Sequence, residues 1–299
     1  MRTPFRAPVS GVVTPGSVTS SGADKLAGLR QTVRAIERQG AMGCMAGSKT
    51  GESAEGAAVL PFGVGVIDAV LPDGGLPSGA VHEVRATAVG DEAAAIGFLC
   101  ALLARLQRQR SGVVLWCQRR DMPREWGGLY GPGLAAFGVD PTRLVGLRLR
   151  RADDVLWAMR EGVATAGGVA AVVGETASPD LTAWRRLQLA AEETGVSGFL
   201  LRGGEGPPSR VGGMFSRWLV RAAASGPVPE LPADLGMAPG FGPGRPRWHV
   251  RLDRCRGGAK GGWDLEWCHE TGSFEARDCA VVTPVFDGPA LPGDTRVAR

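Results

Sequence analysis

The sequence predicts an α/β fold in which a parallel β-sheet is covered by helices on both faces. Between Leu60 and Arg202, short apolar runs alternate with longer runs whose apolar residues recur at helical spacing. A repeated strand–helix order favours parallel strands, because each helix carries the chain back to the edge where the previous strand began. After Arg202, alternating apolar and polar residues separated by Gly-rich turns predict antiparallel strands.

The elements follow one another in a regular order. The first strand, Val81–Val84, leads through a turn containing Gly90 into a long apolar helix at about 91–110. Segment 111–121 contains the apolar run VVLWC, which is typical of a strand buried on both faces. The remaining predicted elements are strand 143–149, helix 151–166, strand 168–175, helix 180–195, strand 196–202, strand 216–225, and antiparallel strands within 246–258 and 261–276.

Composition shifts divide the chain into segments. The α/β core is expected at 59–225 and a C-terminal β extension at 248–279, joined by a Gly/Pro-rich linker at 226–247. Residues 1–24 and 280–299 are expected to be tails, the first of them disordered, and residues 41–58 a linker. Segment 25–40 predicts a short amphipathic helix from the helical spacing of Leu26, Leu29, Val33 and Ile36. That stripe is too short to form a stable helix alone, so we expect it to dock on a second copy or on a partner.

The composition is that of a globular protein, with 44% hydrophobic and 21% charged residues. The formal net charge of +4, carried mostly by arginine, permits contact with nucleic acid without requiring it. The six cysteines form no CxxC pair, so we expect neither a metal site nor another cofactor. No apolar stretch has the length of a membrane span, and we expect a cytoplasmic protein with reduced thiols that does not contact a membrane.

The stretch from Val81 to Arg105 has the outline of a phosphate-binding loop without its chemistry. In a working loop, G-x-x-x-x-G-K-[ST], backbone N–H groups close on phosphate, the lysine reaches the β- and γ-phosphates, and the hydroxyl holds magnesium. Here Val89, Gly90, Asp91 and Glu92 stand at those positions. Two carboxylates suit a helix N-terminus, but they would repel a triphosphate. The sequence therefore predicts a degenerate nucleotide site and no bound cofactor.

The order of motifs resembles the RecA-like fold and, more narrowly, the ImuA family of bacterial damage-induced mutagenesis cassettes. The resemblance covers about 60–279 and is carried by GVGVIDAVLPDGGLPSGAVHEV, DPTRLVGLRLRRADDVLWAMREG, GVAAVVGE, RRLQLAAEETGVSGFLLR, SRWLVRAAAS and RWHVRLDRCRGGAKGGWDLEWCHETG. It implies an accessory protein that binds ImuB, a Y-family-like polymerase homologue, and through it an error-prone C-family polymerase. Together these proteins carry out translesion synthesis in the SOS-type DNA-damage response.

The resemblance also implies that the ATPase machinery is absent. The strand that ends in a water-activating Glu in active RecA-like proteins ends here in Cys117-Gln118-Arg119-Arg120. The strand that should carry a magnesium-linked Asp ends in Glu175, a carboxylate near the right place or a plain polar residue at the rim of the sheet. Phosphoryl transfer needs lysine, metal carboxylate and water-positioning group together, so we expect no catalytic residues.

Two sets of residues are candidates for contacts with macromolecules. Active RecA-like proteins hold single-stranded DNA with mobile loops near 203–215, which makes Arg210, Arg217 and Arg221 candidate DNA contacts. Met214, Phe215 and Trp218 are candidates to stack on bases, although Trp218 in an alternating strand also fits a core position. Arg251, Arg254 and Trp263 are candidate partner contacts, and cross-strand aromatic packing is the alternative for the tryptophan.

Three functional hypotheses follow. The first is a non-catalytic RecA-like adaptor in translesion synthesis, which acts through protein partners, with single-stranded DNA as a further candidate ligand. The second is a DNA-dependent ATPase with an unusual phosphate loop, which needs a cation from elsewhere to replace the missing lysine. The third is a damage-induced inhibitor of cell division.

Overall fold

A computed structural model of the chain describes residues 59–120, 128–165, 167–176, 179–204, 213–225 and 244–277. All of them belong to the compact unit Thr50–Arg299. The predicted helix 25–40, the linker 41–58, both predicted tails, most of the segment 226–247 and Arg210 lie outside the described residues.

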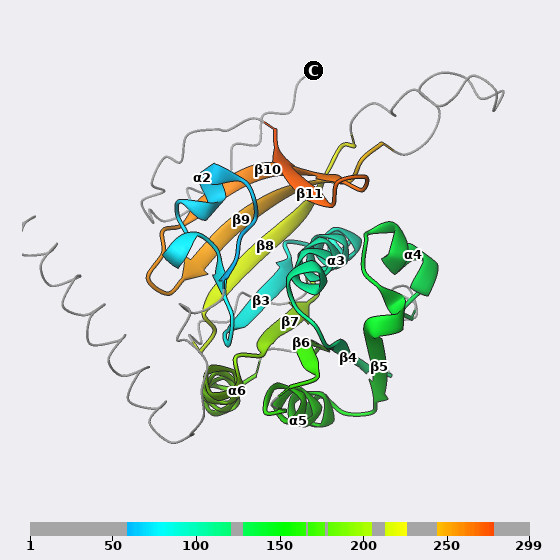
Figure 1. Cartoon of the computed structure of the whole chain (residues 1–299), viewed down its shortest axis with the longest axis vertical. Coiled ribbons are helices and arrows are strands. Elements are labelled where there is room, and N and C mark those ends of the chain that lie inside the picture. Colours follow the sequence, from blue (N-terminus) through cyan, green and yellow to red (C-terminus); the bar gives the residue numbers. More distant parts are fainter. Residues whose placement is uncertain are drawn as a thin grey trace, which may run out of the picture. The chain divides into compact units, whose positions relative to one another are not determined.

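The core of the protein is one nine-stranded sheet with the order β11-β10-β9-β8-β3-β7-β6-β4-β5 (Figure 1). Its six parallel strands are β3 (Val81–Ala86), β4 (Val113–Arg119), β5 (Leu144–Leu149), β6 (Val169–Glu175), β7 (Ser197–Arg202) and β8 (Ser216–Ala223). The antiparallel strands β9 (Arg247–Cys255), β10 (Gly261–Cys268) and β11 (Ser273–Ala276) continue the sheet beyond β8. The C-terminal strands therefore share the backbone hydrogen bonds of the core. A separate two-stranded sheet pairs β1 (Val59–Leu60) with β2 (Leu76–Pro77).

Helices cover both faces of the parallel region, and each face has its own apolar core (Figure 1). The first core lies under α3 (Glu92–Gln109) and α4 (Gly131–Ala136) and includes Ile67 of the short helix α2 (Gly65–Asp68). The second lies under α5 (Ala152–Val163) and α6 (Leu181–Thr194). Glycine allows α6 to lie close at the start of β3. At Gly79 the backbone has φ +68°, and a Cβ atom there would lie 2.8 Å from the carbonyl oxygen of Ala191.

An aromatic cluster fills the first core where the parallel strands meet the antiparallel ones. The ring of Trp218 in β8 lies 4.9 Å from Phe62 and 6.3 Å from Trp263 of β10, measured between centroids. Phe274 of β11 packs 5.4 Å from Phe62 on the same side. Aromatic side chains bury a large apolar area each, so this cluster joins the three antiparallel strands to α3 and the parallel sheet.

The predicted fold class, a parallel sheet flanked by helices with antiparallel C-terminal strands, is confirmed. Predicted and observed helix ends differ by one residue for α3 and α6, while α5 ends at Val163, earlier than the predicted 166. Two elements of the Gly-rich segment before β5 were not predicted. They are α4 and the 3₁₀ turn Pro141–Arg143, whose apolar runs are too short to show a helical period.

Candidate functional site

The turn between β3 and α3 is closed by its own acidic side chains. Asp91 is the residue before α3, and its Oδ2 accepts a hydrogen bond from the Thr87 hydroxyl at 2.5 Å. Its Oδ1 accepts from the backbone N–H of Ala222 in β8 at 3.0 Å. One carboxylate therefore joins the turn to the end of a strand that is more than a hundred residues away in sequence.

Glu92, the first residue of α3, makes a similar pair of contacts. Its Oε2 accepts from the backbone N–H of Gly90 at 2.5 Å, and its Oε1 accepts from the backbone N–H of Gly204, just after β7, at 3.3 Å. Gly90 has φ +99°, a conformation that glycine adopts without strain. Backbone N–H groups at such a turn are the donors that bind phosphate in nucleotide-binding loops. Here the N–H of Gly90 points at Glu92, and the N–H groups of Gly204 and Ala222, which come from two neighbouring strand ends, also point at carboxylate oxygens of the turn.

Glu175 lies at the carboxyl end of β6, two strands away from β3 in the sheet. Its side chain is buried, and Oε1 accepts from the indole N–H of Trp116 at 2.5 Å and from the amide of Gln118 at 2.9 Å. Both donors belong to β4. Burial raises the pKa of this carboxyl, and the hydrogen bonds from Gln118 and Trp116 act in the opposite direction. Gln118 belongs to the segment Cys117-Gln118-Arg119-Arg120, which was expected to lack a water-activating Glu, and its amide donates to Glu175.

Arg217, one of the predicted DNA contacts, lies inside the protein. Its Nε donates to Glu83 Oε2 at 2.6 Å, and only 7% of its side chain is exposed. Glu83 itself is fully buried on β3 and also accepts from Arg202 of β7 at 2.8 Å. A charge removed from water needs such partners, so Arg217 balances Glu83 and does not lie on the surface. The structure corrects the sequence-based placement of this residue.

Three other predicted residues also lie in the core. Trp263 is buried against Trp218, which favours cross-strand packing over a surface anchor for a partner. Met214 and Trp218, two of the three candidate base-stacking side chains, are buried as well, whereas the third, Phe215, is half-buried. A base would reach Trp263, Met214 or Trp218 only by opening the core.

Three predicted arginines lie together on the two neighbouring strands β8 and β9. Arg251 is opposite Leu219 in the register, and Arg221 lies two residues further along β8, so both point to the same face of the sheet. Arg254 is opposite Arg217 beside an irregularity in the register. All three side chains are exposed. We call Arg221, Arg251 and Arg254 the arginine face.

Sequence reasoning missed the residues that hold these sites. Glu83 and Arg202 complete the buried ion cluster, and Gly204 and Ala222 hold the two carboxylates of the turn. A signal for the first was present, because a charged residue within the apolar strand VHEVRA needs a partner when buried. The backbone N–H donors carry no signal, since every residue except proline has one.

No group of three or more His, Cys, Asp or Glu side chains gathers as metal ligands within the described ranges. Among those residues, no helix is both long and apolar enough to cross a membrane.

The sequence is similar to that of protein ImuA from Caulobacter vibrioides, in strains NA1000 / CB15N and ATCC 19089 / CIP 103742 / CB 15. Identity is 42% over 218 residues in both cases, which is 70% of this chain and 83% of the relative. The chain belongs to the ImuA family. No family profile matches it. The resemblance inferred from the motifs is thereby confirmed, and ImuA membership implies a role in the damage-induced mutagenesis cassette.

Proposed function

We propose that the chain is a non-catalytic adaptor in error-prone translesion synthesis, in which acidic side chains have replaced the nucleotide. The observation that carries this proposal is the pair of carboxylates in the β3–α3 turn. Asp91 and Glu92 accept four hydrogen bonds, and one of them comes from the backbone N–H of Gly90, a group of the turn itself that a phosphate would otherwise use.

A triphosphate would meet two obstacles at this turn. It would have to displace those hydrogen bonds, and it would bring negative charge close to both carboxylates. Two like charges 4 Å apart repel by about 4 kcal/mol at the effective dielectric constant typical near a protein surface. No lysine lies between Val81 and Arg105 to offset this repulsion.

The carboxylates also fix the geometry that a nucleotide controls in active relatives of this fold. Asp91 fastens the turn to β8, and Glu92 fastens it to the residue after β7. Gly204 is therefore held against the turn without a ligand. An adaptor needs such a standing surface, because it has no hydrolysis cycle to rearrange it.

The partner that we propose is an ImuB-like Y-family polymerase homologue, with the error-prone C-family polymerase reached through it, in the cytoplasm. The arginine face supports this assignment, because Arg221, Arg251 and Arg254 offer exposed guanidinium groups, which are enriched at interface hot spots. The same charges suit weak binding of single-stranded DNA. Self-association through segment 25–40 is a further proposal.

Isothermal titration calorimetry of the full chain with ATP and Mg²⁺ tests whether the protein binds nucleotide. We expect no heat of binding at micromolar ATP. Glu175→Gln is the matched variant, because it removes the one carboxylate that the ATPase hypothesis would use to hold magnesium. Micromolar, magnesium-dependent binding by the wild type that Glu175→Gln abolishes would support the ATPase instead.

The partner is tested by titrating the purified ImuB-like protein against the wild type and the double variant Arg251→Glu/Arg254→Glu. We expect the double variant to bind at least about 10-fold more weakly, since each reversed charge opposes complementary charge on the partner. Lys260→Glu, in the exposed turn between β9 and β10, is the control for a change in net charge. Equal loss in the control and the double variant would place the interface elsewhere.

A further inference from the structure

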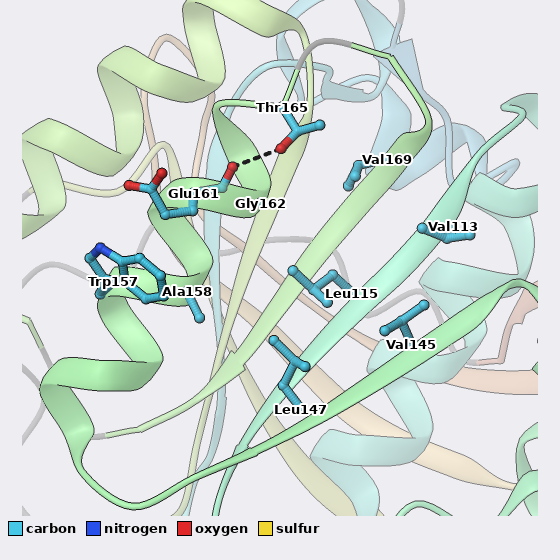
Figure 2. A pocket seen from close by; sticks show the side chains of 10 residues that line it. All are labelled: Val113, Leu115, Val145, Leu147, Trp157, Ala158, Glu161, Gly162, Thr165 and Val169. Carbon is cyan, nitrogen blue, oxygen red and sulfur yellow. Dashed lines mark hydrogen bonds between the residues drawn. The ribbon is translucent and has the colours of Figure 1, made fainter.

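A hollow of about 350 Å³ lies between α5 and the edge strand β5 (Figure 2). Its lining includes Leu115 of the neighbouring strand β4 and Val145 and Leu147 of β5. The hollow exists because α5 packs mainly on β6 and β4 and leaves the outer part of β5 uncovered. Gly162 brings α5 close to the sheet, since a Cβ atom there would lie 2.7 Å from Leu115.

The wall formed by α5 is mostly apolar where it faces the hollow, and its one charged residue there is Glu161, which pairs with Arg160 at 3.2 Å. Figure 2 shows the indole of Trp157 beside the hollow, and 63% of this residue is exposed. Val145, across from it, is 44% exposed. The Thr165 hydroxyl donates to the carbonyl oxygen of Glu161 at 2.9 Å, so it is already satisfied within its own helix. What the hollow offers is therefore mainly hydrophobic surface, which a partner's apolar side chain would remove from water.

A second hollow of about 190 Å³ lies on the other side of the same indole. Trp157 lines both hollows, and the second is bordered by Arg160 of α5 and Arg186 of α6. Arg160 lies 3.2 Å from Glu161, but both side chains are about half exposed and such pairs are weak. Arg186 is exposed. The rim of this second hollow is therefore positive.

The strand beside the first hollow has an outer edge that no other described strand pairs with. This strand, β5, is the last strand of the sheet. An extended peptide can add to such an edge through main-chain hydrogen bonds. Alternate side chains of that peptide would then point to the α5 side of the sheet, where the hollow lies.

We propose that β5, the Trp157 hollows and Arg186 form a docking site for an extended acidic segment of a partner protein. The segment pairs with β5, places an aromatic or large aliphatic side chain beside Trp157, and sets a carboxylate against Arg160 and Arg186. Acidic chemistry follows from these two arginines, and the peptide backbone follows from the strand edge. This surface is distinct from the arginine face, because β5 ends the sheet on the side opposite to the antiparallel strands. The two surfaces would let one adaptor hold two proteins at once.

The test is a selection of random decapeptides displayed on phage against the full chain. We expect enriched peptides to alternate aromatic or large aliphatic residues with Asp or Glu. Trp157→Ala should weaken a selected synthetic peptide at least about 10-fold, and Arg186→Glu at least about 5-fold. The matched controls are Leu189→Ala, an apolar residue on α6 that is 49% exposed and lines neither hollow, and Arg185→Glu. A peptide with alternate backbone nitrogens methylated should lose binding, since it cannot pair with β5.

Several results would overturn the proposal. Enrichment of basic peptides, or no enrichment of any peptide, would rule out an acidic segment as the occupant of this site. Equal binding by Trp157→Ala and Leu189→Ala would place the site elsewhere. Sedimentation velocity tests the other candidate occupant, a second copy of this chain. If the wild type is a dimer and Trp157→Ala is a monomer, a second copy covers the hollow.

Discussion

Replacing Arg217 with methionine tests whether this arginine balances the buried charge of Glu83. The substitution keeps most of the volume of the side chain but removes the guanidinium that lies 2.6 Å from Glu83. Arg202 stays at 2.8 Å, so the carboxylate loses one of its two arginines. Breaking a buried ion pair costs about 3–5 kcal/mol of folding stability. Because Arg202 still pairs with Glu83, we expect a loss near the lower end of this range, at about 3 kcal/mol.

Chemical and thermal unfolding both measure this loss. In urea, the transition midpoint should fall, and by calorimetry the melting temperature should fall by about 6–12 °C, given about 2–4 °C per kcal/mol for a chain of this size. Arg221→Met is the matched control, because it removes an exposed arginine from the same strand and should change stability by less than about 0.5 kcal/mol.

A double-mutant cycle separates the ion pair from other effects of the substitution. When Glu83→Gln is combined with Arg217→Met, the loss should be smaller than the sum of the two single losses, because a neutral amide does not need the guanidinium. The reasoning is refuted if Arg217→Met is as stable as Arg221→Met, or if the two losses simply add. If Arg217→Met bound DNA more weakly but was as stable as the wild type, Arg217 would again be a candidate DNA contact.

Three further predictions concern pH, the N-terminal segment and DNA. The melting temperature of Glu175→Gln should exceed that of the wild type at pH 8 and equal it below about pH 4.5. The reason is that the pKa of Glu175 is raised in the folded state, so wild-type stability falls as pH rises from the ordinary value of 4.5 towards the folded value. Deletion of residues 1–40 should abolish self-association or weaken partner binding in sedimentation and pull-down experiments, whereas deletion of 1–22 should not; no change in either would mean that the helix packs on its own domain. Arg221→Ala and Arg251→Ala should each weaken single-stranded DNA binding equally across sequences and reduce the slope of log K against log salt by about 0.7; an unchanged slope argues against phosphate contact.

The sequence by itself determined the kind and order of most core elements. Continuous apolar runs such as that within β4 gave buried strands, and the helical spacing of apolar residues gave α5 and α6, because burial imposes a period that can be read locally. The lack of a lysine in the β3–α3 turn, on which the proposal of a degenerate nucleotide site rests, was also readable from the sequence. Family membership followed from the order of several motifs.

The exposure of single side chains was decided only by the tertiary structure. Arg217 and Arg221 lie four residues apart on one strand, yet one is buried and the other exposed. The difference comes from Glu83 on a neighbouring strand, which the local sequence around either arginine does not contain. Trp263 was uncertain for the same reason, because an aromatic residue on an alternating strand fits a core or an interface equally well until the facing layer is known.

The sites themselves also depend on contacts between distant parts of the chain. Asp91 and Glu92 could be recognised as unsuited to phosphate, but their hydrogen bonds come from Ala222 and Gly204, which only the parallel pairing of β3 with β7 and β8 brings near. The hollow beside Trp157 has no sequence signal, because it is the space left where α5 covers β4 and β6 but not β5. Periodicity reports which side of an element is buried, whereas the register between strands and the seating of a helix on a sheet determine what each side chain meets.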